Sequence, residues 1–363
     1  MDVCPLIFEP ILKPKIWGGR ELQGKLGKAL PPGQAIGESW EIADLEDDQS
    51  LVSSGPAKGR SIRELLSEWG TGLSGRAPLL DGRFPLLLKF LDARDTLSVQ
   101  VHPDQRMADR LGGSVRLKHE AWYIVDADEG GFIYRGLRDG VDRAAFEAAL
   151  TGGRVEELLE RIPVKKGRCY YLPSGTVHAL GAGVLVAEVQ TPSDVTYRVF
   201  DFNRIDEETG QPRDLHLDEA MECIAFDPRS YPEEHLQHVA SVWTAVTRLV
   251  RCPFFQIERV RMAEGVNQPI PHQEMVVWMV LEGAGLVHYK GADEPLAFRA
   301  GDTVLLPAAL KEGRVETTSA GMWLEVTVPI RSSLADFPHP PASGPKETEG
   351  PQTGFVQLDL PDS

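Results

Sequence analysis

The sequence predicts a mainly β protein with a small helical insertion, and three observations support this fold class. Residues 96–103 (TLSVQVHP) alternate between apolar and polar side chains, as a strand with one buried face does. Residues 167–180 carry a glycine, a Pro-Ser-Gly turn and a histidine, spaced as in a strand that enters a tight turn. Residues 301–307 repeat the first part of this pattern, which indicates an internal repeat.

Elements in the first hundred residues follow from local patterns. Short apolar runs separated by Pro, Gly and aromatic residues predict strands and turns, without a helix, over the first sixty positions. A helix is predicted from Ser61, because Ser61 and Glu64 have the spacing of a capping box and apolar residues follow at helical intervals. The apolar run 84–93 is compatible with a buried strand or a short helix, and its length does not decide between them.

Helical patterns also interrupt the later strands. Residues 142–162 place apolar side chains at helical spacing on both sides of a Thr-Gly-Gly break, which predicts two short helices. Residues 216–224 predict a further helix. From residue 331 the chain is rich in Pro, Ser and Gly, which predicts a loose tail, although residues 355–360 would suit an edge strand.

Composition and charge exclude several classes of function. The 363 residues are 42% hydrophobic and 25% charged, as in a soluble globular chain long enough for two domains. The formal net charge of −16 argues against nucleic acid and anionic membranes, since both require a basic surface. No apolar run approaches the roughly 20 residues that span a bilayer, and residues 1–15 lack the order of a signal peptide, so a cytoplasmic location is predicted. Four scattered cysteines without a CxxC pair predict buried thiols.

Polar residues on the predicted strands form a candidate metal site. Ser98, Gln100 and His102 share the polar face of the strand at 96–103. His178 leaves the Pro-Ser-Gly turn, and Glu120 lies in another strand-like run. Two imidazoles, an amide oxygen and a carboxylate suit Zn²⁺ and also accept Mn²⁺ or Fe²⁺, and the lack of a thiolate favours a catalytic site. Any one of these residues alone is also compatible with an exposed strand face.

The spacing Gly167, five residues, Pro-Ser-Gly, two residues, His178 resembles the second motif of the cupin β-barrels. Cupins place an HxH motif and a later Glu on neighbouring strands, and here Gln100-Val-His102 replaces HxH. Residues 103–119 would be an insertion before Glu120. The resemblance implies two cupin (jelly-roll) barrels. The expected domains are a catalytic barrel at 1–237 with a helical insertion at about 139–163, a metal-free barrel at 238–330 and the tail at 331–363.

Four motifs in order, QVHPD, KxExWY, PSGTVHAL and TYRVFDFNR, resemble type I mannose-6-phosphate isomerase in its shorter bacterial form. The resemblance extends from FEPILKPKIWGG to about residue 225 and more weakly to about residue 330. It implies a metal-dependent aldose–ketose isomerase that interconverts mannose 6-phosphate and fructose 6-phosphate through an enediol(ate). One divalent metal per chain is expected, with Zn²⁺ as the first choice.

The same resemblance assigns roles to individual residues. The expected metal ligands are Gln100, His102, Glu120 and His178. Arg198 matches the arginine that the family places at the reacting end of the sugar. Ser98 and Lys118 match positions near the phosphate. Lys89 is a third candidate for the phosphate, because a lysine inside an apolar run either reaches solvent or faces a polar cavity.

Several further residues lie in the same predicted strands or in other stretches that match the family. Glu188 interrupts an apolar strand-like run and is expected either at the barrel interior or away from the site. His119 is predicted to point away from Glu120, because neighbouring residues in a strand alternate between faces. Trp17 and the Glu38-Ser-Trp40 cluster match family stretches but would also suit an aromatic core.

Two other functions are compatible with the ligand set. A non-haem iron oxygenase uses two His and one carboxylate, which this chain supplies if Gln100 does not bind. A non-catalytic two-barrel cupin that binds a sugar or a metal would explain the fold without Arg198, Lys118 or Ser98. The basic, hydroxyl-bearing surroundings favour the isomerase. The predicted partner is a small phosphosugar, and a monomer or weak homodimer is expected.

Overall fold

The computed structural model describes residues 2–113, 115–205, 210–227, 237–271 and 273–330. Strands dominate these ranges, which confirms the predicted mainly β class, and they form antiparallel sheets of six, five, seven and four strands. The predicted tail from residue 331 and the possible edge strand at 355–360 lie outside the described residues. No helix within the described ranges is long and apolar enough to cross a membrane.

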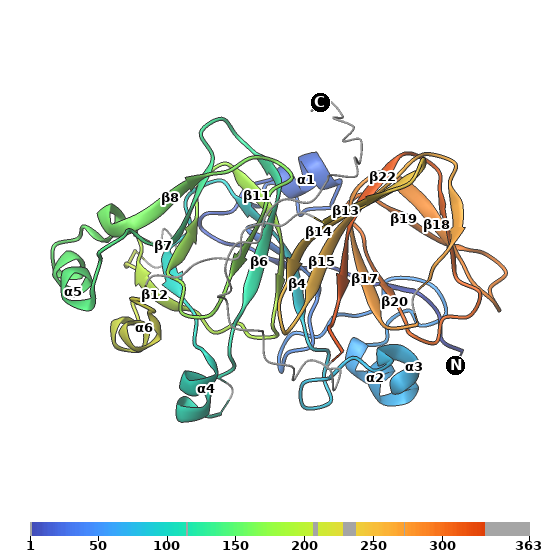
Figure 1. Cartoon of the computed structure of the whole chain (residues 1–363), viewed down its shortest axis with the longest axis horizontal. Helices are drawn as coiled ribbons and strands as arrows, with labels where there is room; N and C mark the ends of the chain where they lie inside the picture. Colours follow the sequence, from blue (N-terminus) through green and yellow to red (C-terminus); the bar gives the residue numbers. More distant parts are fainter. Residues whose placement is uncertain (1, 114, 206–209, 228–236, 272, 331–363) are drawn as a thin grey trace, which may run out of the picture. The chain divides into compact units, whose positions relative to one another are not determined.

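Two sheets from the first two thirds of the chain face each other and carry, within or next to their strands, the predicted metal ligands (Figure 1). The six-stranded sheet has the order β2 (Ile11–Lys13), β3 (Glu38–Ile42), β4 (Leu87–Ala93), β11 (Val184–Gln190), β6 (Glu120–Ala127) and β9 (Cys169–Leu172). The five-stranded sheet has the order β12 (Tyr197–Phe200), β5 (Val99–Val101), β10 (His178–Leu180), β7 (Phe132–Leu137) and β8 (Leu159–Pro163). Trp122 and Val186 of the larger sheet share one buried cluster with Ile133 and Leu180 of the smaller sheet.

The other two sheets repeat this arrangement. The seven-stranded sheet has the order β1 (Leu6–Ile7), β20 (Thr303–Leu306), β17 (Val276–Glu282), β22 (Gly321–Thr327), β15 (Gln256–Met262), β14 (Thr244–Arg251) and β13 (Gln237–Ala240). The four-stranded sheet has the order β16 (Asn267–Pro269), β21 (Arg314–Thr317), β18 (Ala284–His288) and β19 (Leu296–Arg299). The order β4-β11-β6-β9 recurs as β15-β22-β17-β20, and β5-β10-β7-β8 recurs as β16-β21-β18-β19. This correspondence supports the internal repeat.

The six-stranded and seven-stranded sheets pack against each other. Phe90 and Tyr123 from the first and Ile257 and Leu324 from the second belong to one buried cluster. A buried ion pair lies in the same layer, where Lys28 Nζ is 2.7 Å from Glu41 of β3 and donates to the carbonyl of Gly301 just before β20. The N-terminal strand β1 also pairs with β20, so the start of the chain completes a sheet built mainly from its end.

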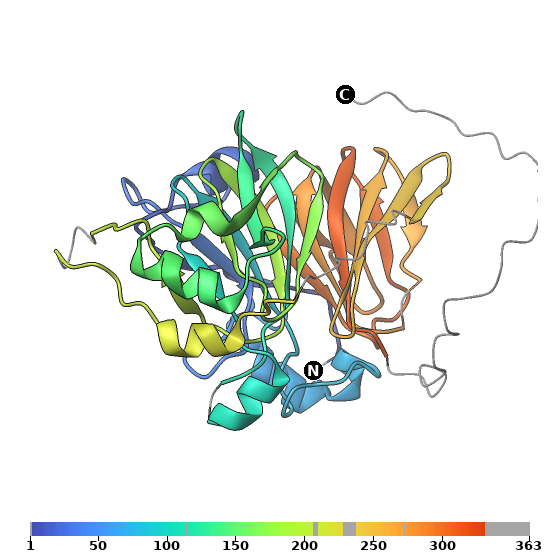
Figure 2. The ribbon, with the colours of Figure 1, turned by 60° about the vertical axis from the view of Figure 1, so that its left-hand side comes forward.

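The helices lie at the edges and on the outer faces of these sheets. They are α1 (Glu21–Leu26), α2 (Ile62–Trp69), α3 (Thr71–Ser74), α4 (Gln105–Leu111), α5 (Arg143–Thr151), the 3₁₀ helix η1 (Val155–Leu158) and α6 (Leu217–Cys223). Helix α2 begins with the predicted capping box of Ser61 and Glu64. Helices α5 and α6 cover the outer face of the five-stranded sheet, away from the strands of the second repeat (Figures 1 and 2). The ambiguous run 84–93 contains strand β4.

Two local predictions were wrong. The first sixty residues do contain a helix, α1, whose start is capped by a distant side chain: the backbone N–H of Glu21 donates to Asp92 Oδ2 of β4 at 2.6 Å. A cap supplied from another strand leaves no local sequence signal. The second helix predicted within 142–162 is only the 3₁₀ helix η1, because the residues from Leu159 pair with β7 as strand β8.

Candidate metal centre

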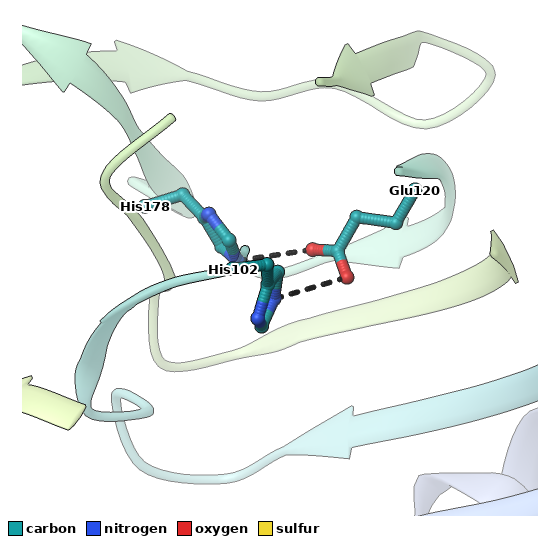
Figure 3. Close-up of side chains that lie close together, drawn as sticks. All are labelled: His102, Glu120 and His178. Carbon is teal, nitrogen blue, oxygen red and sulfur yellow. Dashed lines mark ion pairs between the residues drawn. The ribbon is translucent and has the colours of Figure 1, made fainter. Parts of the chain in front are cut away.

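Three buried side chains converge between the five-stranded and six-stranded sheets (Figure 3). His102 directly follows β5, His178 is the first residue of β10, and Glu120 is the first residue of β6. Their candidate ligand atoms all lie within 4.8 Å of one another, and each residue is at most 2% exposed. Each residue stands at or next to the end of a strand, and the pairing of these strands brings the three ends together.

Backbone carbonyls fix which nitrogen of each histidine faces the centre. His102 Nδ1 lies 3.1 Å from the carbonyl oxygen of Val195, and His178 Nδ1 lies 2.8 Å from that of Thr176. A carbonyl only accepts, so each Nδ1 must carry the proton and donate it. In the neutral imidazole, Nε2 therefore carries the lone pair that can bind a metal. This is the usual arrangement of metal-bound histidines.

The remaining polar atoms fit a cation. His102 Nε2, His178 Nε2 and both Glu120 oxygens are buried and have no hydrogen-bond partner among the described residues. They are nevertheless close together, with His178 Nε2 3.0 Å from Oε1 and His102 Nε2 3.3 Å from Oε2 of Glu120. Lone pairs that face one another at this distance repel unless a positive charge lies between them. Two imidazoles and a carboxylate are a ligand set for a divalent metal.

Electrostatics keep these donors in their metal-binding forms. Burial, helped by the charge of Lys118, lowers the pKa of His102 to about 3. Burial alone would raise the pKa of Glu120, but Lys118 and the two histidines hold it well below its usual value. The imidazole of His102 is therefore neutral and the carboxylate of Glu120 is ionised at neutral pH, as metal ligation requires.

Gln100 is placed beside this cluster by strand register. It pairs directly with His178 on β10 and with Arg198 on β12, so the three side chains share one face of the five-stranded sheet. Val99 and Val101 point to the opposite face, where they pack in the cluster that includes α6. The predicted division of this strand into a polar and an apolar face is confirmed for these residues. Ligation of the metal by Gln100 stays a prediction.

The residues expected at the sugar and phosphate lie around the cluster. Lys118 is 4% exposed, and its Nζ lies 3.2 Å from Glu120 Oε2. Arg198 donates from Nε to Ser98 Oγ at 3.3 Å and from Nη1 to the carbonyl of Asp214 at 2.7 Å. Lys118 therefore supplies a cation beside the buried Glu120 carboxylate, and Arg198 and Ser98 form a contact of their own on the neighbouring strands β12 and β5.

Lys89 faces the interior and does not reach solvent, the two alternatives that its place in an apolar run allowed. The lysine is 4% exposed, and its Nζ lies 3.5 Å from Glu38, 3.6 Å from Glu188 and 3.8 Å from Asp194. Burial would lower the pKa of Lys89, but these three carboxylates raise it above its usual value. A permanently charged ammonium ion is thus held among acidic groups on the same face as the metal cluster.

Glu188 belongs to the interior as well. Its carboxylate accepts from Trp122 Nε1 at 2.8 Å, and the Trp122 ring lies edge-on to His178 with centroids 5.3 Å apart. Burial and the charge of Glu120 raise the pKa of Glu188. Glu38 differs, because the charges of Lys89 and Lys15 outweigh burial and lower its pKa to about 2.

Other residues near the site have structural contacts. Trp40 donates to Glu38 and lies between Lys13 and Lys89, whose Nζ atoms are 4.6 and 4.7 Å from its ring. Trp17 is a core residue of the cluster between the two sheets. His119 points away from Glu120, as predicted, and its Nδ1 lies 2.7 Å from the Tyr171 hydroxyl. Cys4, Cys169, Cys223 and Cys252 are all buried free thiols, as predicted.

Sequence reasoning missed two groups that support the cluster. The carbonyl of Val195, which orients His102, lies 93 residues further along the chain, so local spacing contains no sign of it. Gln190 is fully buried opposite Glu120, and its amide donates to the carbonyls of Thr191 and Ser193 in the same loop. A glutamine at the end of an apolar strand was the only available signal.

The second repeat has no equivalent cluster among the described residues. Residues 272–291 parallel residues 118–136 in sequence, which places Glu274 opposite Glu120. Glu274 accepts instead from the backbone and Nε of Arg76. Strand β21, the counterpart of β10, begins with the exposed Arg314, which donates to Asn267 of β16. Trp278, Phe298 and Trp323 pack together inside this repeat. His272, two residues before Glu274, lies outside the described residues.

The fold and the buried His-Glu-His cluster together define a metal-binding cupin. Comparison with known families identifies the branch: the sequence model described as "Phosphomannose isomerase type I, catalytic domain" matches residues 6–131. The mannose-6-phosphate isomerase ManA of Bacillus subtilis is 36% identical over 318 residues, which cover 87% of this chain and 97% of that protein. The mannose-6-phosphate isomerase of Streptococcus mutans is 35% identical over 307 residues, which cover 85% and 93%.

A solved structure agrees with these relatives. The crystal structure of the mannose 6-phosphate isomerase from Bacillus subtilis superposes with a TM-score of 0.80 at 31% identity and covers 89% of this chain and 99% of that one. The chain therefore belongs to the type I phosphomannose isomerase family, and it is a metal-dependent isomerase. These relatives give no support to the oxygenase or to the non-catalytic sugar-binding cupin.

Proposed function

We propose that this chain interconverts mannose 6-phosphate and fructose 6-phosphate at the space between its five-stranded and six-stranded sheets. The observation that carries the proposal is the buried His102-Glu120-His178 cluster, whose unpartnered donor atoms fit a divalent metal. Cationic side chains flank it, as an anionic phosphosugar requires. The names of the similar enzymes from Bacillus subtilis and Streptococcus mutans support the same substrate.

The proposed reaction moves one hydrogen between neighbouring carbons. A proton leaves C2 of the aldose and an enediol(ate) forms. A proton is then returned to C1, and the hydroxyl proton passes from O2 to O1, so that the carbonyl moves from C1 to C2 without an external oxidant. A divalent metal bound there would polarise the carbonyl and hydroxyl oxygens of the sugar. Gln100, His102, Glu120 and His178 would hold it, and Zn²⁺ is the proposed ion because nitrogen and oxygen donors suit it.

The chain's own cations would handle the negative charges. Arg198 uses Nε and Nη1 within the protein, and no hydrogen bond from its Nη2 is found in the described part of the chain. Its guanidinium would donate to the oxygen on which charge grows in the enediolate, and it stays protonated at every working pH. Lys118, Ser98 and Lys89 would bind the phosphate, with Lys118 supplying the charge closest to the cluster.

The second repeat, residues 238–330, is proposed to stabilise the fold without binding a metal. Its interior is filled by aromatic and aliphatic side chains, and Glu274 is already paired with Arg76. The chain is accordingly expected to bind one metal ion.

A coupled assay tests the proposed function. Purified protein is supplied with mannose 6-phosphate, and the formation of fructose 6-phosphate is followed before chelation, after chelation and after Zn²⁺ is restored. We expect turnover that is lost with the metal and regained with it. Glucose 6-phosphate serves as the epimer control. Turnover that persists after verified removal of the metal would contradict the proposed role of the cluster, and no turnover of the zinc-loaded protein would contradict the substrate.

A further inference from the structure

Arg198 is held in place by a short segment that follows it in the chain. The backbone N–H of His216 donates to the carbonyl of Arg198 at 2.8 Å, and the N–H of Arg198 donates to His216 Nδ1 at 3.2 Å. The guanidinium itself donates to the carbonyl of Asp214 at 2.7 Å. Residues 213–216, called the strap below, therefore fix both the backbone and the side chain of Arg198.

The strap is anchored by an ion pair between its first residue and a buried carboxylate. Arg213 donates from Nε to Asp201 Oδ2 at 2.8 Å and from Nη2 to Oδ1 at 2.5 Å, which is a two-point contact. Asp201 is 5% exposed and directly follows β12, three residues after Arg198. Arg204 also donates to Asp201 Oδ1, and its Nη1 reaches the carbonyl of Thr96. Asp201 thus joins the end of β12 to the strap through Arg213. Through Arg204 it is also linked to Thr96, which lies shortly before β5.

The backbone just after Asp201 forms a strained turn, and the ion pair between Asp201 and Arg204 spans this turn. Phe202 and Asn203 both have a φ of +54°, a region that a bulky residue such as Phe rarely adopts. The backbone N–H of Arg204 closes the turn on the carbonyl of Asp201 at 3.1 Å. Such conformations persist where surrounding contacts over-determine them, and they are concentrated at functional sites. The two ends of the turn are linked a second time by the Asp201–Arg204 contact.

The charges give Asp201 a second effect on Arg198. Arg198, Arg204 and Arg213 lie close enough for Arg213 and Arg204 both to lower the pKa of Arg198, after the larger effect of burial. Asp201 counters them, and its own pKa is lowered by Arg213 and Arg204 despite burial. Without this carboxylate, three guanidinium groups would repel one another across a partly buried region.

We propose that Asp201 and Arg213 are positioning residues of the isomerase site, which hold the Arg198 guanidinium in its working place through the strap. The inference rests on the proposed function of Arg198. Neither residue is required to touch the sugar. Their effect on turnover is exerted through Arg198 alone, and this separates positioning from a general contribution to folding.

A double-mutant cycle tests this separation. Arg213→Ala is expected to lower kcat for mannose 6-phosphate by about 10²-fold, a loss that a displacement of a catalytic group by about 1 Å can cause. In an Arg198→Ala background the same change is expected to lower kcat by less than about twofold, because coupled residues are not additive. Arg213→Lys keeps the charge without the two-point contact and is expected to fall between wild type and Arg213→Ala. Equal losses in the two backgrounds would overturn the proposal.

The matched control is Arg248→Ala, which removes an arginine paired with Glu258 in the second repeat. It is expected to leave kcat unchanged. The metal content and melting temperature of every variant are measured alongside, so that a variant that fails to fold is recognised. If Arg213→Ala fails to fold, the milder substitution Asp201→Asn is tested in its place.

A second measurement does not depend on turnover. In protein labelled with ¹⁵N-arginine, the Nε–H signal of Arg198 is assigned by its loss in Arg198→Ala. It is expected to shift and broaden in Arg213→Ala and to stay unchanged in Arg248→Ala. An unchanged signal in Arg213→Ala would overturn the positioning role even if mannose 6-phosphate proved not to be the substrate, whereas a missing wild-type turnover alone would overturn only the proposed function.

Discussion

Replacing Lys118 by Met separates binding of the phosphate from binding of the metal. The Lys118 ammonium is 4% exposed and lies 3.2 Å from Glu120 Oε2, so the substitution removes a buried charge beside a metal ligand while keeping most of the side-chain volume. A charge-assisted contact contributes about 1.5–3 kcal/mol. Burial places Lys118 in the upper part of this range, which corresponds to a loss of about two decades in affinity for a phosphosugar.

Metal binding should respond differently. A divalent cation bound to Glu120 is repelled by the ammonium of Lys118, because like charges a few ångström apart interact unfavourably in a buried site. Lys118→Met is therefore expected to keep the metal at least as tightly as wild type while KM for mannose 6-phosphate rises by about 10²-fold. The coupled assay gives KM, and elemental analysis after dialysis against a graded series of chelator concentrations gives the metal retention.

Lys166→Met is the matched control, because Lys166 also pairs with a carboxylate, Glu282, but both side chains are more than half exposed on the surface. It should change neither quantity. An unchanged KM in Lys118→Met would remove this residue from the phosphate site. Loss of the metal from Lys118→Met would show that the ammonium mainly supports the Glu120 carboxylate, and the phosphate would then have to be bound by other cations.

Three further predictions concern the metal and the packing of the two repeats. His178→Ala should lose nearly all bound metal in elemental analysis, and stoichiometric metal in that variant would refute the site. Glu274→Ala should keep the metal content of wild type, since that carboxylate binds Arg76, whereas a fall by half would reveal a second site. Glu41→Ala should lower the free energy of unfolding in urea by about 3–5 kcal/mol, because Lys28 stays buried without its partner. The exposed Glu46→Ala should cost less than about 1 kcal/mol, and equal losses would show that burial of the Lys28–Glu41 pair is unimportant.

Local sequence predicted those parts of the fold whose cause is local. The capping box of Ser61 and Glu64 and the alternation around Val99 and Val101 depend on neighbours within a few residues, and both appear in the structure. Helix α1 depends on Asp92, about seventy residues away, and β8 depends on pairing with β7. Such contacts between distant segments outweigh weak local preferences, so no pattern within the segments themselves could have predicted them.

The candidate site shows the same division. Strand alternation and the Pro-Ser-Gly turn singled out His102 and His178, and the resemblance to the cupins was needed to bring them together with Glu120 in one site. Neither could show that Lys89 lies between Glu38 and Glu188, since those three residues come from three strands. Every residue type supplies a backbone carbonyl, so the amino-acid sequence gives no sign that the carbonyl of Val195 contacts His102. This contact is visible only in the folded chain.

The two repeats show how one strand order supports different interiors. In the first, the ends of β5, β6 and β10 carry buried lone pairs that repel one another, an arrangement that weakens the fold unless a cation is bound. In the second, Trp278, Phe298 and Trp323 occupy the interior, and their burial contributes stability without any ligand. Because β3 and β4 of the first repeat pack against the sheet of the second, the apolar repeat can offset the destabilising site of its neighbour.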